Sequence, residues 1–175
     1  MGFQSPIQAI MLHSIGVISS PYKRAEETPI QPVYALGVKG TAELFPEYAD
    51  GLRDLEGFSH IYLIYYFHKA KSAQLIVKPF LEDVPRGVFA TRAPRRPNPI
   101  GFSLVRLVKI EGNVLYLEDV DVLDGTPLWD IKPYIPRFDH RENVRCGWQE
   151  DVDEVTACAR GRRQGGEVPA SWRSR

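Results

Sequence analysis

Three prolines within six residues set the firmest limit on how this chain can fold. They stand at positions 94, 97 and 99, inside the segment from Gly87 to Leu104. Each proline ring fixes φ and removes a backbone donor, which excludes a helix or a central strand here. The residues before the prolines are pushed towards extended geometry. The segment predicts a rigid loop, entered by a short strand over 87–91 and left at Gly101, where the chain is expected to turn back.

The same region carries positive charge without an opposing carboxylate. Between residues 85 and 110 there are six basic residues and no Asp or Glu. A stiff cationic loop loses little conformational entropy when it binds an anion, and arginine suits bidentate contact with phosphate or carboxylate. The plain alternative is a solvated proline loop with surface arginines. The density of prolines and arginines around Asn98 favours a binding site.

Composition indicates one globular domain. The chain has 175 residues, 43% hydrophobic and 25% charged, which is enough to bury a core. A net charge of zero argues against a protein that coats polyanions with its whole surface, but it allows a local basic face. Cys146 and Cys158 fit no zinc spacing and are too few for a disulfide framework, which indicates a reducing, cytoplasmic compartment. No apolar run has membrane-spanning length, so no membrane association is expected.

Short β-rich runs separated by turn signals fill the middle of the chain. The run from Phe58 to His68 is nearly unbroken in β-branched and aromatic residues, which predicts a strand covered on both faces. Glu111-Gly112-Asn113 and Asp124-Gly125 are turn signals. A short amphipathic helix is expected over 46–55, ending at Gly57. The other expected strands cover 14–20, 36–44, 103–110, 114–120 and 128–132.

These elements predict a mainly β, single-domain fold with one or two short helices. Closure into a small β-barrel would protect the strand edges. We expect an N-terminal arm over 1–13, the barrel over 14–138 and an irregular tail over 139–175. The end of the tail carries five arginines against Glu167 alone, which is typical of a mobile solvated segment. A weak phosphate-binding arm is the alternative interpretation.

Several long motifs occur in a fixed order along the chain. They are the runs at 15–23, 55–60, 87–92, 96–101, 123–127 and 130–134. Together they resemble the TsaA-like (YaeB-like) family of tRNA methyltransferases, over about residues 14–138. The resemblance implies a small β-barrel that forms a homodimer and uses S-adenosyl-L-methionine. It also implies N6-methylation of threonylcarbamoyl-modified adenosine beside the anticodon of certain tRNAs.

The resemblance further implies which residues bind the cofactor. Aromatic and aliphatic side chains among them suit the purine and the sulfonium, and an Asp-Gly turn lets a ligand approach the backbone. Arg92 suits the carboxylate of the cofactor. The matching positions are Pro29, Ile30, Gln31, Phe67, His68, Arg92, Leu104, Leu123, Asp124, Gly125 and Thr126.

A tRNA substrate gives the basic proline-rich loop a function. Specific RNA recognition usually targets single-stranded loop bases, so Arg95, Arg96 and Asn98 are expected to contact the anticodon stem-loop. Longer members of the family carry an extra C-terminal domain that helps to bind tRNA. Here only about 40 residues follow the predicted barrel. Binding of the cofactor is therefore better supported than activity on that particular tRNA.

The sequence does not single out the proton acceptor for methyl transfer. Adenine N6 is a poor nucleophile, and its proton must be taken up during or after attack. Asp124, Asp130 or a water could accept it, although Asp130 with Lys132 equally forms a structural pair. No residue is therefore assigned as catalytic.

The sequence allows two other classes of function. One is a non-catalytic β-barrel that binds S-adenosyl-L-methionine or RNA. The other is a barrel hydrolase or metal enzyme, which is weakest because no nucleophile motif appears. The histidines show no ligand spacing, so no metal is expected. They are His13, His60, His68 and His140.

Overall fold

A computed structural model, which describes residues 10–163, has a closed antiparallel barrel at its centre. The strands follow the order β1-β2-β7-β6-β3-β8, and β8 pairs with β1 to close the ring. This confirms the predicted fold class, a mainly β barrel with few short helices. The barrel strands are β1 (Gly16–Ser19), β2 (Gly40–Leu44), β3 (His60–Tyr66), β6 (Ile100–Glu111), β7 (Val114–Glu118) and β8 (Thr126–Pro133).

Strand β3 shows how alternation builds the core. Ile61, Leu63 and Tyr65 point into the barrel and are at most 4% exposed. Tyr62 and Ile64 between them are only half-buried. The prediction that both faces of this strand are covered was therefore wrong, because the apolar residues of the outer face stay partly open. Full burial of an aliphatic side chain contributes about 1.5–3 kcal/mol, so the inward set dominates the stability of the barrel.

Two predicted turns close the strand connections. Gly112 joins β6 to β7 with a φ of 61°, and Gly125 leads into β8 with a φ of 72°. Both angles lie in the left-handed region, where a residue without Cβ is favoured. The turn signals in the sequence are confirmed at both positions.

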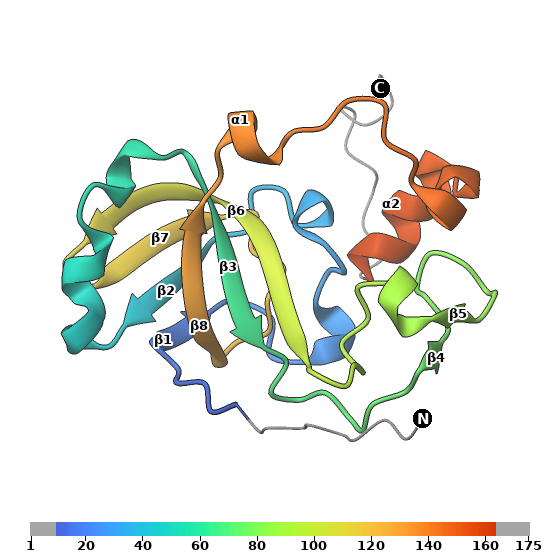
Figure 1. The fold of residues 1–175 in the computed structure, drawn as a ribbon, viewed down its shortest axis with the longest axis horizontal. Coiled ribbons are helices and arrows are strands. Elements are labelled where there is room, and N and C mark those ends of the chain that lie inside the picture. The colour runs from blue at the N-terminus through green and yellow to red at the C-terminus, as the bar shows by residue number, and fades with distance from the viewer. Residues whose placement is uncertain (1–9, 164–175) are drawn as a thin grey trace, which may run out of the picture.

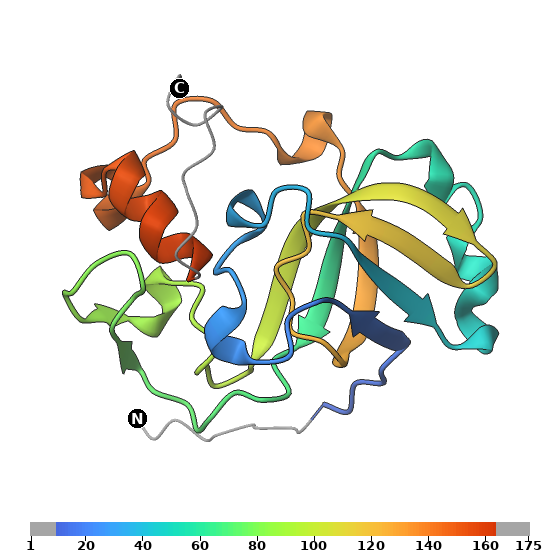
Figure 2. The same cartoon turned by 180° about the vertical axis from the view of Figure 1, so that it is seen from behind.

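The barrel forms one side of the molecule, and a smaller group of segments lies beside it (Figure 1). That group contains the hairpin of β4 (Ile76–Val77) with β5 (Arg86–Gly87) and the helix α2 (Glu154–Arg162). The view from behind shows the loop between β1 and β2 running between the two parts (Figure 2). This loop contains the 3-10 helices η1 (Ala25–Glu27) and η2 (Pro32–Tyr34).

Several local expectations failed where tertiary contacts decide the conformation. The predicted strand over 87–91 is instead the 3-10 helix η5 (Val88–Ala90). The predicted amphipathic helix is the 3-10 helix η3 (Pro46–Leu52), and Gly57 closes a separate one, η4 (Leu55–Gly57). The remaining short helices are α1 (Pro136–Asp139) and η6 (Gly147–Asp151).

Gly101 does not turn the chain back, contrary to the prediction. It lies inside β6, paired with Tyr65 of β3. A Cβ at this position would lie 2.6 Å from Cζ of Tyr65 and 2.8 Å from Cζ of Phe67. Glycine is therefore needed here because two aromatic rings occupy the space of a side chain.

The C-terminal part of the described chain folds back onto the loops. Asp153 caps α2 by accepting a hydrogen bond from the Thr156 N–H at 2.9 Å. Near the other end of α2, the Gly161 carbonyl accepts from the Ile30 N–H at 2.9 Å. The expectation of an irregular tail is thus wrong for this helix. The predicted mobile end after residue 163 and the first nine residues of the predicted arm lie outside the described residues.

Among residues 10–163, neither α-helix combines the length and apolar character that crossing a bilayer requires.

A candidate cofactor and substrate cavity

A large cavity of about 1240 Å³ lies between the barrel and the segments beside it. Its walls come from the η1–η2 loop, the end of β3, the proline-rich loop with the start of β6, and the segment before β8. Small-molecule sites usually have volumes of about 300–1000 Å³ and mostly apolar walls with a few polar groups. The cavity can therefore hold a ligand of cofactor size together with part of a second molecule.

Nine of the eleven predicted cofactor residues line this cavity, although they come from distant parts of the sequence. Asp124 and Gly125 do not line it. The structure thus brings nine of the predicted residues together in one cavity. The lining members are Pro29, Ile30, Gln31, Phe67, His68, Arg92, Leu104, Leu123 and Thr126.

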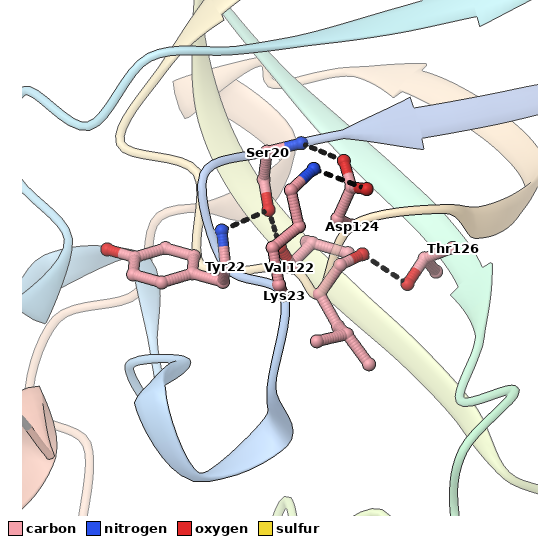
Figure 3. Close-up of polar contacts among 7 residues, drawn as sticks. Ser20, Tyr22, Lys23, Val122, Asp124 and Thr126 are labelled. Atoms are coloured by element: carbon pink, nitrogen blue, oxygen red, sulfur yellow. Dashed lines mark hydrogen bonds and ion pairs between the residues drawn. The ribbon is translucent and has the colours of Figure 1, made fainter.

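Asp124 faces the β1 side of its turn rather than the cavity (Figure 3). Its carboxylate accepts the Ser20 N–H at 3.0 Å and forms an ion pair with Lys23 at 2.6 Å. These partners, Lys23 first, hold the pKa of Asp124 below its usual value. A carboxylate so engaged is a poor proton acceptor. It anchors the turn that places Leu123 and Thr126 on the cavity wall.

Arg92 connects the proline-rich loop to the opposite cavity wall. Its guanidinium donates a hydrogen bond to Oε1 of Gln31 and lies over the Phe102 ring, 4.8 Å from the ring centre. Arg92 is nevertheless an exposed residue. A cation at the cavity mouth with one contact to a neutral amide can still bind an anionic ligand group.

His68 is held in one orientation by its neighbours. The Thr126 hydroxyl donates to the Leu123 carbonyl at 2.6 Å and lies 3.3 Å from Nδ1 of His68. Since the hydroxyl hydrogen is used, Thr126 can only accept from His68, which assigns the proton to Nδ1 and the lone pair to Nε2. Burial, followed by the charge of Lys69, lowers the pKa of His68. The ring is therefore a neutral acceptor at pH 7.

A buried polar chain at the cavity wall was missed from the sequence. Asp121, which is 6% exposed, accepts a hydrogen bond from Ser103 Oγ at 2.5 Å, and Ser103 Oγ lies 3.0 Å from the Tyr65 hydroxyl. All three residues line the cavity. Burial raises the pKa of Asp121 to about 7, against the opposing effect of the Ser103 hydrogen bond. One signal was available, since Asp121 interrupts the apolar run Val120 to Leu123.

The C-terminal segment also contributes wall residues that the sequence did not indicate. Trp148 donates from Nε1 to the Ala90 carbonyl at 2.8 Å. Arg163 stacks over the Phe80 ring, 3.6 Å from its centre. Both line the cavity. No sequence pattern pointed to them, because their place depends on the docking of α2.

The predicted RNA-contacting residues differ in how far their side chains are already engaged in hydrogen bonds within the protein. Arg96 donates from one nitrogen to the carbonyls of Val88, Thr91 and Ala93, at 2.8–3.3 Å, so it stiffens the loop. Arg95 donates from Nε to the Ser72 carbonyl at 3.2 Å. Asn98 is exposed.

The other predicted acceptor, Asp130, lies away from the cavity. It forms an ion pair with Lys132 at 2.8 Å on β8, as the structural interpretation expected. Within the described part of the chain, no group of three or more His, Cys, Asp or Glu side chains is arranged to hold a metal ion.

Comparison with known proteins identifies the family. Residues 17–140 match the model described as the tRNA-methyltransferase O N-terminal domain. The chain belongs to this family. The matched region contains the barrel except Gly16, the first residue of β1, whereas η6 and α2 lie beyond it.

Individual relatives and a solved structure agree with this placement. A probable S-adenosyl-L-methionine-binding protein of Pyrococcus abyssi is 58% identical, over 81% of this chain and 77% of the relative. A mouse tRNA (adenine(37)-N6)-methyltransferase is 37% identical, over 77% of this chain but only 33% of the mouse protein. A crystal structure of TrmO from Pseudomonas aeruginosa is 39% identical, with a TM-score of 0.68, over 81% of this chain and 63% of that one.

Proposed function

We propose that this protein is an S-adenosyl-L-methionine-dependent tRNA methyltransferase. Its product would be N6-methylated, threonylcarbamoyl-modified adenosine beside the anticodon. One observation carries the proposal: residues expected to bind the cofactor, drawn from distant segments, meet in a single cavity. The names of the relatives support the same activity, namely S-adenosyl-L-methionine binding and tRNA adenine N6 methylation.

The cavity walls fit each part of S-adenosyl-L-methionine. Phe67 and Leu104 offer apolar surface for the purine or the sulfonium. Arg92 at the mouth offers a cation to the carboxylate, and Nε2 of His68 offers an acceptor to an N–H group. The backbone contributes as well. The Phe67 N–H donates a hydrogen bond to the Pro99 carbonyl at 2.8 Å, and this bond fixes the end of β3.

Methyl transfer to adenosine N6 requires mainly that the reacting groups be held in the correct positions. When bound, S-adenosyl-L-methionine supplies a methyl group already activated by its positive sulfur. Holding an acceptor nitrogen in line with that group supplies much of the rate enhancement. A cavity with room beyond the cofactor lets a base flipped out of an RNA loop reach the methyl group.

Thermal stabilisation and methyl incorporation test the proposal together. S-adenosyl-L-methionine and its demethylated product should each raise the unfolding temperature, because both bind the folded chain only. Labelled methyl groups should then appear in tRNA that carries the threonylcarbamoyl modification and not in tRNA lacking it. Absence of both effects would remove the proposal.

A non-catalytic binding protein is the second candidate. It is favoured by the name of the Pyrococcus relative, a probable S-adenosyl-L-methionine-binding protein. Thermal stabilisation without methyl incorporation into any modified tRNA would support this candidate instead.

For tRNA contact we propose the surface formed by Arg95, Arg96, Asn98 and Phe89. Phe89 is 76% exposed and lies beside Arg96, with 6.0 Å between the guanidinium and the ring centre. An exposed aromatic ring next to cations suits stacking with a single-stranded base. Arg95→Ala should lower the slope of log affinity against log salt by about one, whereas Arg53→Ala, at the C-terminal end of η3, should not.

For the homodimer we propose the outer face of β3 and β6. Tyr66, Ile100 and Phe102 remain 36–45% exposed there, and a shallow apolar hollow lies between Tyr62 and Phe102. A second copy would cover this face and lie beside the cavity mouth, since Phe102 also lines the cavity. Light scattering should give twice the chain mass, and Phe102→Glu should give a monomer.

A tRNA substrate agrees with the cytoplasmic location expected from the sequence.

A further inference from the structure

The polar chain Tyr65–Ser103–Asp121 is buried in the cavity wall. Ser103 is 1% exposed, Tyr65 is 4% exposed and Asp121 is 6% exposed. They come from β3, β6 and the segment after β7, so three separate parts of the fold converge here. Burying a carboxyl group is unfavourable unless it is neutralised or paired. Such a placement needs an explanation.

A purely structural role explains this arrangement poorly. The hydrogen bond from Ser103 engages Oδ1 of Asp121, and among the described residues it is the only hydrogen bond of this carboxylate to another side chain. No lysine or arginine forms an ion pair with it within the described residues. Asp124, in contrast, has both an N–H donor and a lysine. Asp121 therefore retains the capacity to interact with a molecule in the cavity.

We propose that Asp121 accepts the N6 proton of the substrate adenosine during methyl transfer, with Ser103 and Tyr65 fixing its orientation. This inference rests on the proposed methyltransferase function. In the balanced step, the N6 lone pair forms the new bond to the methyl carbon. The methyl–sulfur bond breaks, and its electron pair stays on sulfur. The N6–H bond gives its proton to the Asp121 carboxylate, which later releases it to water.

The surroundings suit this assignment. Burial raises the pKa of Asp121 to about 7, so the group is a stronger base than an exposed carboxylate and is still partly ionised at neutral pH. Arg92 is the cation that favours its ionised form. The other titratable groups that interact with it are Tyr65 and Tyr22, and burial and the charge of Asp121 raise the pKa of both. Both tyrosines are neutral at pH 7 and do not compete for the proton.

The variant Asp121→Asn separates this role from a structural one. Asparagine keeps the shape and the acceptor oxygen for Ser103 but cannot take up the proton. Calorimetry with the demethylated cofactor should give a Kd within threefold of the wild-type value. Single-turnover methyl transfer to modified tRNA should fall by about 10²–10⁴-fold, the usual contribution of general base catalysis. Glu111→Gln, at the distant β6–β7 hairpin, is the matched control and should keep the wild-type rate.

Two measurements make the proposal falsifiable beyond a loss of activity. The wild-type rate should rise with pH to a plateau with a midpoint near 7, and Asp121→Asn should lose that rise. Carboxyl NMR of ¹³C-labelled aspartate should show one group titrating near pH 7 in the wild type and none in the variant.

Three results would overturn the proposal. They are a variant rate within threefold of wild type, loss of cofactor binding in the variant, or a pH rise that survives in Asp121→Asn and disappears in His68→Asn. Failure of the wild type to bind the cofactor or to methylate tRNA would instead refute the proposed function, and the NMR titration would still report on Asp121.

Discussion

Asp121→Asn should make the folded chain more stable at pH 8, even though it removes a charge that we connect with catalysis. The substitution keeps the acceptor for Ser103 but removes the ability to ionise. Burial raises the pKa of Asp121 to about 7 in the folded chain, against an ordinary value of 3.8. At about 1.4 kcal/mol per pH unit, keeping this carboxylate ionised inside the fold costs at most about 4 kcal/mol.

The pH window follows from proton binding. Between pH 3.8 and about 7 the folded chain holds a proton on Asp121 that the unfolded chain has released. Stability therefore falls as pH rises through this window, because the folded state binds more protons. Below the window both states are protonated and Asp121 has no effect. Above it the full destabilisation remains, so the advantage of the variant is largest there.

Urea unfolding at a series of pH values measures this difference. The other titrating groups are the same in both proteins and cancel when the two curves are subtracted. With a typical m value of about 2 kcal/mol per M, the unfolding midpoint of Asp121→Asn should exceed that of the wild type by up to about 2 M urea at pH 8. The midpoints should converge near pH 4. A difference that stays flat between pH 4 and pH 8, or a variant less stable at pH 8, would refute the reasoning.

Three further substitutions test the fold around the cavity. Gly101→Ala should lower the free energy of unfolding, measured in urea, by about 1–3 kcal/mol, because its Cβ would meet two aromatic rings. Gly51→Ala, whose Cβ would meet nothing within 4 Å, should leave that free energy unchanged, and equal effects of the two variants would contradict this reasoning. Asp124→Ala should lower stability by about 1 kcal/mol yet leave the calorimetric affinity for the demethylated cofactor within threefold, and a tenfold loss would show direct contact instead. Gly161→Val should undock α2 from Tyr34, since a Cβ would lie 2.5 Å from that ring, and amide exchange of α2 should then speed up while the barrel stays protected.

The barrel could be predicted because its signals are local. The β-branched and aromatic run of β3 and the glycine turns at 112 and 125 depend on residues close together in sequence, and the structure has the strand and both turns, although only one face of the strand is fully buried. The motifs shared with the family then indicated which segments meet in the cavity. Their convergence could be expected from the resemblance but not from any single segment.

The remaining features depend on contacts between distant residues. Gly101 looked like a turn residue, yet glycine is needed there because the rings of Tyr65 in β3 and Phe67 just after it exclude a side chain. Val88 to Ala90 looked like a strand, yet they form a 3-10 turn whose carbonyls are held by Arg96 and Trp148. Asp121 lay in an apolar run with no motif around it, and only the fold brings Ser103 and Tyr65 to its side.

The most direct test of the central claim is a crystal structure with the demethylated cofactor bound at saturating concentration. The account predicts density in the cavity between barrel and loops, in contact with Phe67, His68 and Thr126, and with the amino-acid end near Arg92. Density elsewhere on the molecule, or an empty cavity at that concentration, would contradict the account.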